Sequence, residues 1–164
     1  MREELTVASP DDMRALGRRL AAMLRPGDLV VLNGALGTGK TTLVQGIGAG
    51  LGVRGPVTSP TFVIARVHPS VTGGPALVHA DAYRLASPAE VDDLDLDASL
   101  ETSVTVVEWG GELAGALAAD RLEVSIALAG PGGAPGGAGP DQEPRTVRLE
   151  GHGARWNTAP VPRA

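Results

Sequence analysis

A glycine-rich octet is the part of the chain whose residue types could most directly do chemistry. Residues 34–41 read Gly-Ala-Leu-Gly-Thr-Gly-Lys-Thr and match G-x-x-x-x-G-K-[ST] at every fixed position. The glycines allow positive φ and let backbone N–H groups face an anion without a Cβ in the way. Lys40 carries a charge that can reach the β- and γ-phosphates of a nucleotide, and the Thr41 hydroxyl can bind Mg²⁺. The pattern is typical of a phosphate-binding loop, or P-loop.

The sequence on either side of this loop supports a site for ATP with Mg²⁺. Residues 28–33 form a short apolar run that predicts a buried strand, and a helix is predicted from about Lys40 to Leu51. Such a helix would direct the positive end of its dipole at the same phosphates. A glycine-rich turn without a ligand is the alternative, which this strand–loop–helix context disfavours. The predicted nucleotide contacts are Gly34, Leu36, Gly37, Thr38, Gly39, Lys40, Thr41 and Thr42.

Two carboxylates are placed to act beside this loop. Asp81 closes the apolar run LVHAD, and Glu108 closes SVTVVE. Both should emerge at the carboxyl edge of a sheet, where ligands of open α/β folds bind. P-loop enzymes use such carboxylates to hold Mg²⁺ or a water molecule. A solvated carboxylate at a strand end is the alternative for each one alone. We predict that Lys40, Asp81 and Glu108 are catalytic.

The other acidic residues and the histidines do not predict a specific binding site. The acidic run from Asp92 to Asp97 lacks the glycine and the final glutamate of a calcium loop, so it predicts a solvated face or a surface for a basic partner. His68 and His79 are too scattered to predict a metal site.

Composition and charge limit the classes of function. The chain has 164 residues, 43% of them hydrophobic and 20% charged, which is ordinary for one folded domain. It has no cysteine, which excludes disulfides, thiolate metal sites and cysteine nucleophiles. The net charge of −5 argues against tight autonomous binding of nucleic acid, so any RNA would need a partner to hold it. No apolar stretch approaches the roughly 20 residues that cross a bilayer, and no secretory signal is visible. We expect a cytoplasmic protein without a membrane contact.

Strands alternate with helices along most of the chain. A helix is predicted from Ser9 to Leu24, because Ser9 can cap it and Pro10 suits its first turn. Ser87 opens a short helix. Besides residues 28–33, the predicted strands are 61–67, 77–81, 103–108, 122–128 and 145–150.

These elements predict an α/β fold: a single P-loop NTPase-like domain with a mostly parallel central sheet, flanking helices and a C-terminal antiparallel hairpin. The domain is expected to span residues 1–150. Within it, residues 130–140 (GPGGAPGGAGP) predict a flexible loop. Residues 151–164 are expected to be a poorly ordered tail.

Four motifs in order resemble the TsaE (YjeE) family. They are the P-loop, Ser-Pro-Thr-Phe at 59–62, His-Ala-Asp-Ala-Tyr-Arg-Leu at 79–85, and Val-Glu-Trp at 107–109. The resemblance covers about Ser9 to Leu128. It implies a bacterial ATPase that acts with the TsaD and TsaB proteins in forming threonylcarbamoyladenosine in tRNA. TsaD and TsaB would make the modification and present the tRNA, and ATP hydrolysis by this chain would support repeated turnover.

The resemblance also implies roles for single residues. Lys40 would bind phosphate and Thr41 would bind Mg²⁺. Thr61 would lie close to the γ-phosphate and the metal, in a segment that responds to nucleotide. Asp81 resembles the Walker B-type residue, and Glu108 the residue that acts on Mg²⁺ or on the attacking water.

The chain departs from the family pattern in three places. Ala35 stands where many members carry an acidic residue, which should alter only the rim of the loop. Residues 130–140 and the tail have no recognised counterpart. The family's adenine contacts come from an N-terminal segment, here Ser9 to Met13, which matches poorly.

Two other functions stay open. A P-loop kinase for a small molecule would need an acceptor pocket and an arginine-rich lid, for which Arg84 alone is thin support. A module that binds nucleotide without turnover is the second. Phosphate release with and without acceptors would separate these possibilities.

Overall fold

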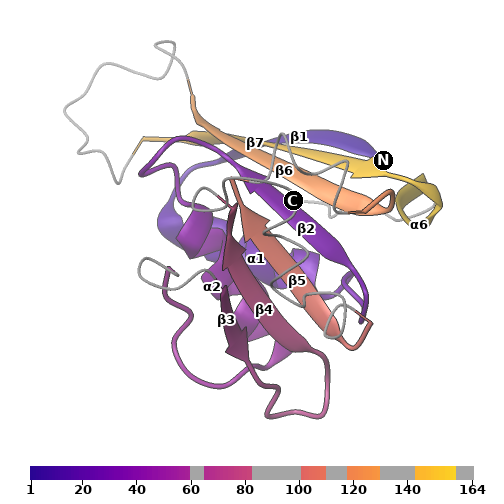
Figure 1. Cartoon of the computed structure of the whole chain (residues 1–164). Coiled ribbons are helices and arrows are strands. Elements are labelled where there is room, and N and C mark those ends of the chain that lie inside the picture. Colours follow the sequence, from indigo (N-terminus) through magenta and orange to yellow (C-terminus); the bar gives the residue numbers. More distant parts are fainter. Residues whose placement is uncertain (60–64, 83–100, 110–117, 130–142, 158–164) are drawn as a thin grey trace.

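The structure, a computed structural model, describes residues 1–59, 65–82, 101–109, 118–129 and 143–157. These residues form one seven-stranded sheet with the order β1-β7-β6-β2-β5-β4-β3 (Figure 1). The strands are β1 Arg2–Val7, β2 Leu29–Asn33, β3 Ala65–His68, β4 Ala76–Asp81, β5 Ser103–Glu108, β6 Arg121–Leu128 and β7 Arg145–His152. The helices are α1 Pro10–Ala21, α2 Lys40–Leu51 and α6 Ala154–Asn157.

The centre of the sheet is parallel and both of its edges are antiparallel. Strands β6, β2, β5 and β4 run parallel, whereas β3 pairs antiparallel with β4 on one side. On the other side, β7 pairs antiparallel with β6, and β1 with β7. The α/β class is therefore confirmed, and the parallel arrangement holds for the four central strands but not for the three edge strands. The expected C-terminal pairing is the one between β6 and β7.

Helices α1 and α2 lie side by side against one face of the sheet (Figure 1). Two glycines let them approach closely. A Cβ on Gly17 would lie 2.4 Å from the carbonyl oxygen of Leu43, and one on Gly46 would lie 2.3 Å from that of Arg14. Side chains of both helices then form the main core with the inward faces of the strands, including Leu16, Leu20, Leu43, Ile47, Val30, Leu32, Val104 and Val106. No helix among the described residues is long and apolar enough to cross a membrane.

The opposite face of the central strands also contributes buried side chains. A second, smaller cluster there contains Leu29, Val31, Ala80, Ala82 and Val107. Burial on both faces explains why residues 29–32 and 103–108 read as continuous apolar runs instead of alternating ones. These rigid strands fix the positions of the residues at their carboxyl ends.

The N-terminal strand β1 was not predicted from the sequence. Its residues alternate between exposed and half-buried. This alternation is not visible as a hydrophobic pattern in the sequence, because Arg2, Glu3 and Glu4 are all charged. The strand exists because β7 supplies a partner, with Arg2 opposite Glu150 and Glu4 opposite Arg148. Such a strand depends on a segment far away in the sequence.

Residues 151–157 differ from the poorly ordered tail that we expected. Strand β7 continues to His152, and α6 places Trp156 in the core with none of its surface exposed. Arg155 forms an ion pair of 2.9 Å with the buried Asp28 and donates to the carbonyl oxygen of Met23. The segment is therefore packed, and the expectation of disorder is wrong for these residues.

Several expectations lie outside the described residues. They concern Thr61 and the first half of the strand 61–67, Tyr83 and Arg84, the helix opened by Ser87, the acidic run 92–97, and the loop 130–140. Residues 158–164 of the expected tail also lie outside them.

Candidate functional site

The P-loop connects the end of β2 to the start of α2 through backbone shapes that favour glycine. Gly37 has φ of 80° and Gly39 has φ of 102°, both in the left-handed region. Gly34 is confined as well, because a Cβ there would lie 2.6 Å from the carbonyl oxygen of Ile126. The Thr38 hydroxyl donates to the carbonyl oxygen of Ala35 at 2.9 Å and braces the turn. The loop thus has the conformation that its glycines predict.

A cavity of about 870 Å³ opens beside this loop. Its volume lies in the range of roughly 300–1,000 Å³ usual for small-ligand pockets. It is lined by most of the residues predicted for the site: Leu36, Gly37, Thr38, Gly39, Lys40, Thr41, Thr42, Asp81 and Glu108. Gly34 is not among the lining residues, although its carbonyl oxygen contacts Lys40. The position of Thr61 lies outside the described residues, but Ser59, which precedes it in the same motif, lines the cavity.

Lys40 is buried at the base of the cavity, where several groups accommodate its charge. Its Nζ donates to the carbonyl oxygens of Gly34 at 2.7 Å and Ala35 at 3.0 Å. It also lies 4.2 Å from the ring centroid of Trp109, a cation–π contact. Burial lowers the pKa of Lys40, while the Glu108 and Asp81 carboxylates act in the opposite direction. The ammonium group is thus held beside the loop, close to both acids.

Trp109 has an unusual backbone for such a large residue. Its φ of 62° lies in the left-handed region, and it is the one described non-glycine residue with positive φ. Its N–H donates to the carbonyl oxygen of Leu32 at 2.8 Å, which ties the end of β5 to β2. Strain of this kind costs about 1–3 kcal/mol and clusters at functional sites. Here it turns the indole ring over Lys40.

Asp81 and Glu108 end two neighbouring parallel strands and lie directly opposite each other in the register of β4 and β5. Both line the cavity together with Thr41. Glu108 is only 5% exposed and accepts a hydrogen bond of 2.8 Å from His79 Nε2. One hydroxyl and two carboxylates form an all-oxygen donor set. Mg²⁺ prefers such donors when nucleotide phosphates and waters complete its shell, so these residues fit that ion.

The cavity is also lined by residues that the sequence analysis located only in part. The segment Ser9–Met13, which the resemblance assigned to adenine, contributes Ser9, Pro10 and Met13, and Val7 precedes it. Buried Val7 and Met13 give part of the cavity lining an apolar surface. Their apolar character fits the flat face of a base.

Arg145, at the start of β7, is a lining residue that the sequence analysis missed. Its Nε donates to the carbonyl oxygen of Thr38 at 3.2 Å, and its Nη2 to that of Gly37 at 3.5 Å. The guanidinium therefore braces the P-loop from the opposite wall. No local pattern marks Arg145, because the contact depends on the strand order that brings β7 close to β2.

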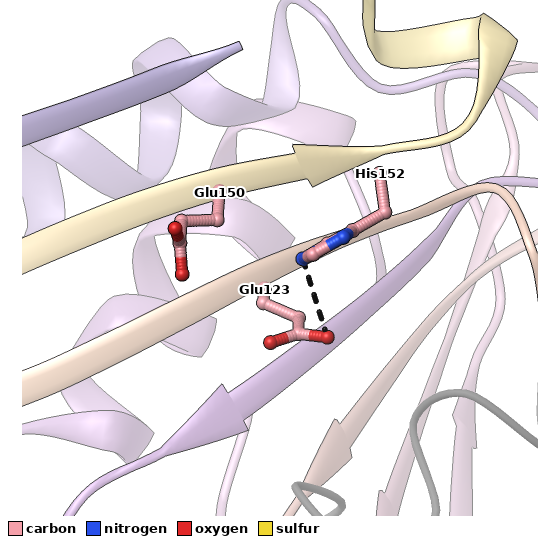
Figure 2. A group of neighbouring side chains, drawn as sticks. All are labelled: Glu123, Glu150 and His152. Carbon is pink, nitrogen blue, oxygen red and sulfur yellow. Dashed lines mark ion pairs between the residues drawn. The ribbon is translucent and has the colours of Figure 1, made fainter.

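A second cluster of ionisable groups lies on β6 and β7, away from this cavity. Figure 2 shows Glu123, Glu150 and His152 gathered on one face, with His152 Nε2 3.4 Å from a Glu123 oxygen. Each carboxylate already has an arginine partner, since Arg121 lies 2.7 Å from Glu123 and Arg2 lies 2.6 Å from Glu150. These contacts join β1, β7 and β6 as ion pairs, and the cluster carries no metal assignment.

Comparison with known proteins agrees with this geometry. Residues 7–131 match the family described as "Threonylcarbamoyl adenosine biosynthesis protein TsaE". A Streptomyces coelicolor protein named "tRNA threonylcarbamoyladenosine biosynthesis protein TsaE" is 58% identical over 150 residues, covering 91% of this chain and 97% of its own. A Bacillus subtilis protein of the same name is 37% identical, covering 74% and 75%. The crystal structure of Bacillus subtilis YdiB superposes with a TM-score of 0.72 at 27% identity, covering 95% of this chain and 89% of its own. The chain therefore belongs to the TsaE family of tRNA threonylcarbamoyladenosine biosynthesis proteins.

Proposed function

We propose that the protein is a Mg²⁺-dependent ATPase that supports threonylcarbamoyl modification of adenosine 37 in tRNA. One observation carries the proposal. The P-loop residues Lys40 and Thr41 line the same cavity as the two strand-end carboxylates, Asp81 and Glu108. The residues that we propose bind phosphate and metal thus line one cavity, as P-loop hydrolysis requires.

Each group has a proposed task. Backbone N–H groups of the loop and the Lys40 ammonium bind the β- and γ-phosphates. Thr41, Asp81 and Glu108 hold Mg²⁺ or a water molecule in its shell, and Thr61 joins them when nucleotide is present. When bound, Mg²⁺ would neutralise the charge that develops on the phosphates. Because Glu108 is buried and hydrogen-bonded, we assign to it the orientation of the attacking water, and to Asp81 the metal.

The nucleoside half of ATP is assigned to the apolar part of the cavity lining. Val7, Pro10 and Met13 offer apolar contacts to adenine, and Arg145 supports the loop beneath the phosphates. The apolar and the charged parts of the lining thus match an apolar base and a charged triphosphate. This division supports a nucleotide over a smaller anion as the ligand.

The biological role is inferred from the family and from charge. Relatives carry the name of a tRNA threonylcarbamoyladenosine biosynthesis protein. The net charge of −5 opposes a tRNA backbone, so we propose that TsaD and TsaB hold the tRNA in the cytoplasm while this chain turns over ATP. Ser59 begins the Ser-Pro-Thr motif at the cavity, which is a suitable place to report the presence of a γ-phosphate to a partner.

The test measures phosphate release with ATP, with and without Mg²⁺, small-molecule acceptors, and TsaD with TsaB. The proposal expects slow Mg²⁺-dependent release by the protein alone and faster release with the partners. Transfer of phosphate to an acceptor would support the kinase alternative. Tight binding of ATP without release under any of these conditions would support a binding module and refute the ATPase.

A further inference from the structure

His79 and Glu108 form a buried contact below the cavity. His79 is fully buried on β4, and its Nε2 lies 2.8 Å from Glu108 Oε1 on β5. A carboxylate oxygen accepts, so we assign the hydrogen to Nε2 and treat the imidazole as the donor. His79 is not among the described residues that line the cavity, whereas Glu108 is. The histidine therefore reaches the site only through the glutamate.

We infer that His79 is a positioning residue that holds the Glu108 carboxylate in the orientation required for ATP hydrolysis. The inference rests on the proposed function and adds to it a residue outside the cavity. Ligating or catalytic carboxylates are commonly fixed by a hydrogen bond from behind, and loss of such a partner typically lowers activity by about 10- to 100-fold. Glu108 has one oxygen engaged in this way, which limits the rotation of its carboxylate.

The sheet geometry explains why the contact is so well defined. His79 and Asp81 are two residues apart on β4, so they project from the same face. In the register of β4 and β5, Asp81 lies opposite Glu108 and His79 lies opposite Val106. His79 therefore contacts Glu108 diagonally across the strand pair. It lies two residues before Asp81 on β4, and so further from the cavity. Both ends of the hydrogen bond are anchored on central strands.

Packing alone explains this histidine poorly. The preceding residue on the same face, Leu77, is fully buried and apolar, as is Val106 across the strand pair. An apolar side chain at position 79 would continue this surface. A buried ion pair or polar pair is weak evidence for stability, because desolvation offsets the attraction. The imidazole is therefore better explained by what it does to Glu108.

The experiment compares variants that keep or remove the donor. His79→Gln places an amide N–H close to the Nε2 position, whereas His79→Met fills a similar volume without a donor. His79→Asn is a second, polar variant that is too short to reach Glu108. Thr105→Val is the matched control, because Thr105 is fully buried on β5 and its hydroxyl has no partner among the described residues. Each variant is measured for kcat and KM in Mg²⁺-dependent phosphate release, with folding checked by thermal unfolding.

We expect His79→Met and His79→Asn to lower kcat by about 10- to 100-fold while KM for ATP stays within about twofold. His79→Gln should recover most of the loss, and Thr105→Val should match the parent. The decisive arm is a double-mutant cycle. In a Glu108→Gln background, His79→Met should lower kcat less than about twofold further, because its effect passes through the glutamate.

Three outcomes would overturn the inference. A parent-like kcat in folded His79→Met or His79→Asn would do so. An equal loss of kcat in His79→Gln and His79→Met would also do so. Additive losses in the cycle would show a purely structural contribution. If the parent protein itself releases no phosphate with Mg²⁺, the proposed function fails and this inference fails with it. That outcome differs from an active parent whose kcat does not change when His79 is substituted.

Discussion

Lys40 is the residue on which the proposed phosphate site depends most. Its ammonium is buried, and the loop carbonyls and the Trp109 ring hold it beside the cavity. Lys40→Ala removes this charge and should reduce ATP affinity and turnover by at least about 100-fold. The fold should survive, because the substitution adds no group to the core. Binding of fluorescent ATP and phosphate release, measured beside the thermal unfolding of the same variant, test this expectation.

An exposed cation offers a matched control for that substitution. Arg148→Ala also removes one positive charge, but Arg148 lies on β7 and pairs with Glu4 at the surface. It should leave ATP affinity within about twofold, because exposed ion pairs contribute little. Equal losses for the two variants would indicate a general effect of net charge, and unchanged binding by folded Lys40→Ala would refute the phosphate site.

Asp81 is expected to act through the metal and not through the phosphates. Asp81→Asn keeps the shape of the side chain but removes the charge that attracts Mg²⁺. We expect Mg²⁺-dependent turnover to fall by about 100-fold, while ADP affinity without Mg²⁺ changes less than about threefold. Titrating Mg²⁺ against phosphate release distinguishes a weaker metal site, which high Mg²⁺ would rescue, from a lost one. Parent-like turnover at every Mg²⁺ concentration would remove Asp81 from the site.

Strand β7 contributes to the site from outside the motifs. Arg145→Ala should lower ATP affinity by about tenfold and leave kcat largely intact, because its guanidinium braces the loop carbonyls instead of the carboxylates. Arg145→Lys should recover only part of this affinity, since an ammonium cannot donate along both directions of the fork. A fall in kcat with unchanged affinity would contradict this assignment.

Helix α6 is expected to stabilise the fold through one side chain. Trp156 is fully buried, and Gly151 leaves room for it, because a Cβ there would lie 2.5 Å from the Trp156 Cβ. Trp156→Ala should lower the free energy of unfolding by about 3–5 kcal/mol. Leu128→Ala is the control, because Leu128 is 51% exposed and should change the free energy by less than about 0.5 kcal/mol. Urea unfolding of both variants measures the difference.

The sequence predicted the elements whose signals are local. The glycines, Lys40 and Thr41 specify a loop within a few residues, and Asp81 and Glu108 follow apolar runs that mark central strands. The strand β1, the packing of Trp156 and the contact of Arg145 with the P-loop could not be predicted in this way. Strand β1 and Arg145 depend on partners more than 100 residues away, as the hydrogen bond from Arg145 to Thr38 illustrates with a separation of 107. Trp156 lies in a short segment without a periodic apolar pattern.

At the scale of the whole molecule, the net charge of −5 predicts weak binding to tRNA by the protein alone. We expect tRNA modification to require TsaD and TsaB, and to proceed beyond one round only when this protein is added. The Lys40→Ala variant should not replace it. A turnover assay for the modified adenosine checks both statements. Multiple rounds without the protein would refute the role, and tight tRNA binding by the protein alone would refute presentation by partners.

The pairing of β1 with β7 also has a consequence for folding during synthesis on the ribosome. Arg2 lies opposite Glu150, so β1 can pair with β7 only after the residues up to position 150 have been synthesised. The cavity shares this delay, because Val7 and Met13 line it together with Arg145. A nascent chain that has exposed the P-loop but not β7 therefore has an incomplete nucleotide site. Long-range pairing of this kind slows folding, and here it would delay completion of the proposed nucleotide site until β7 has been synthesised.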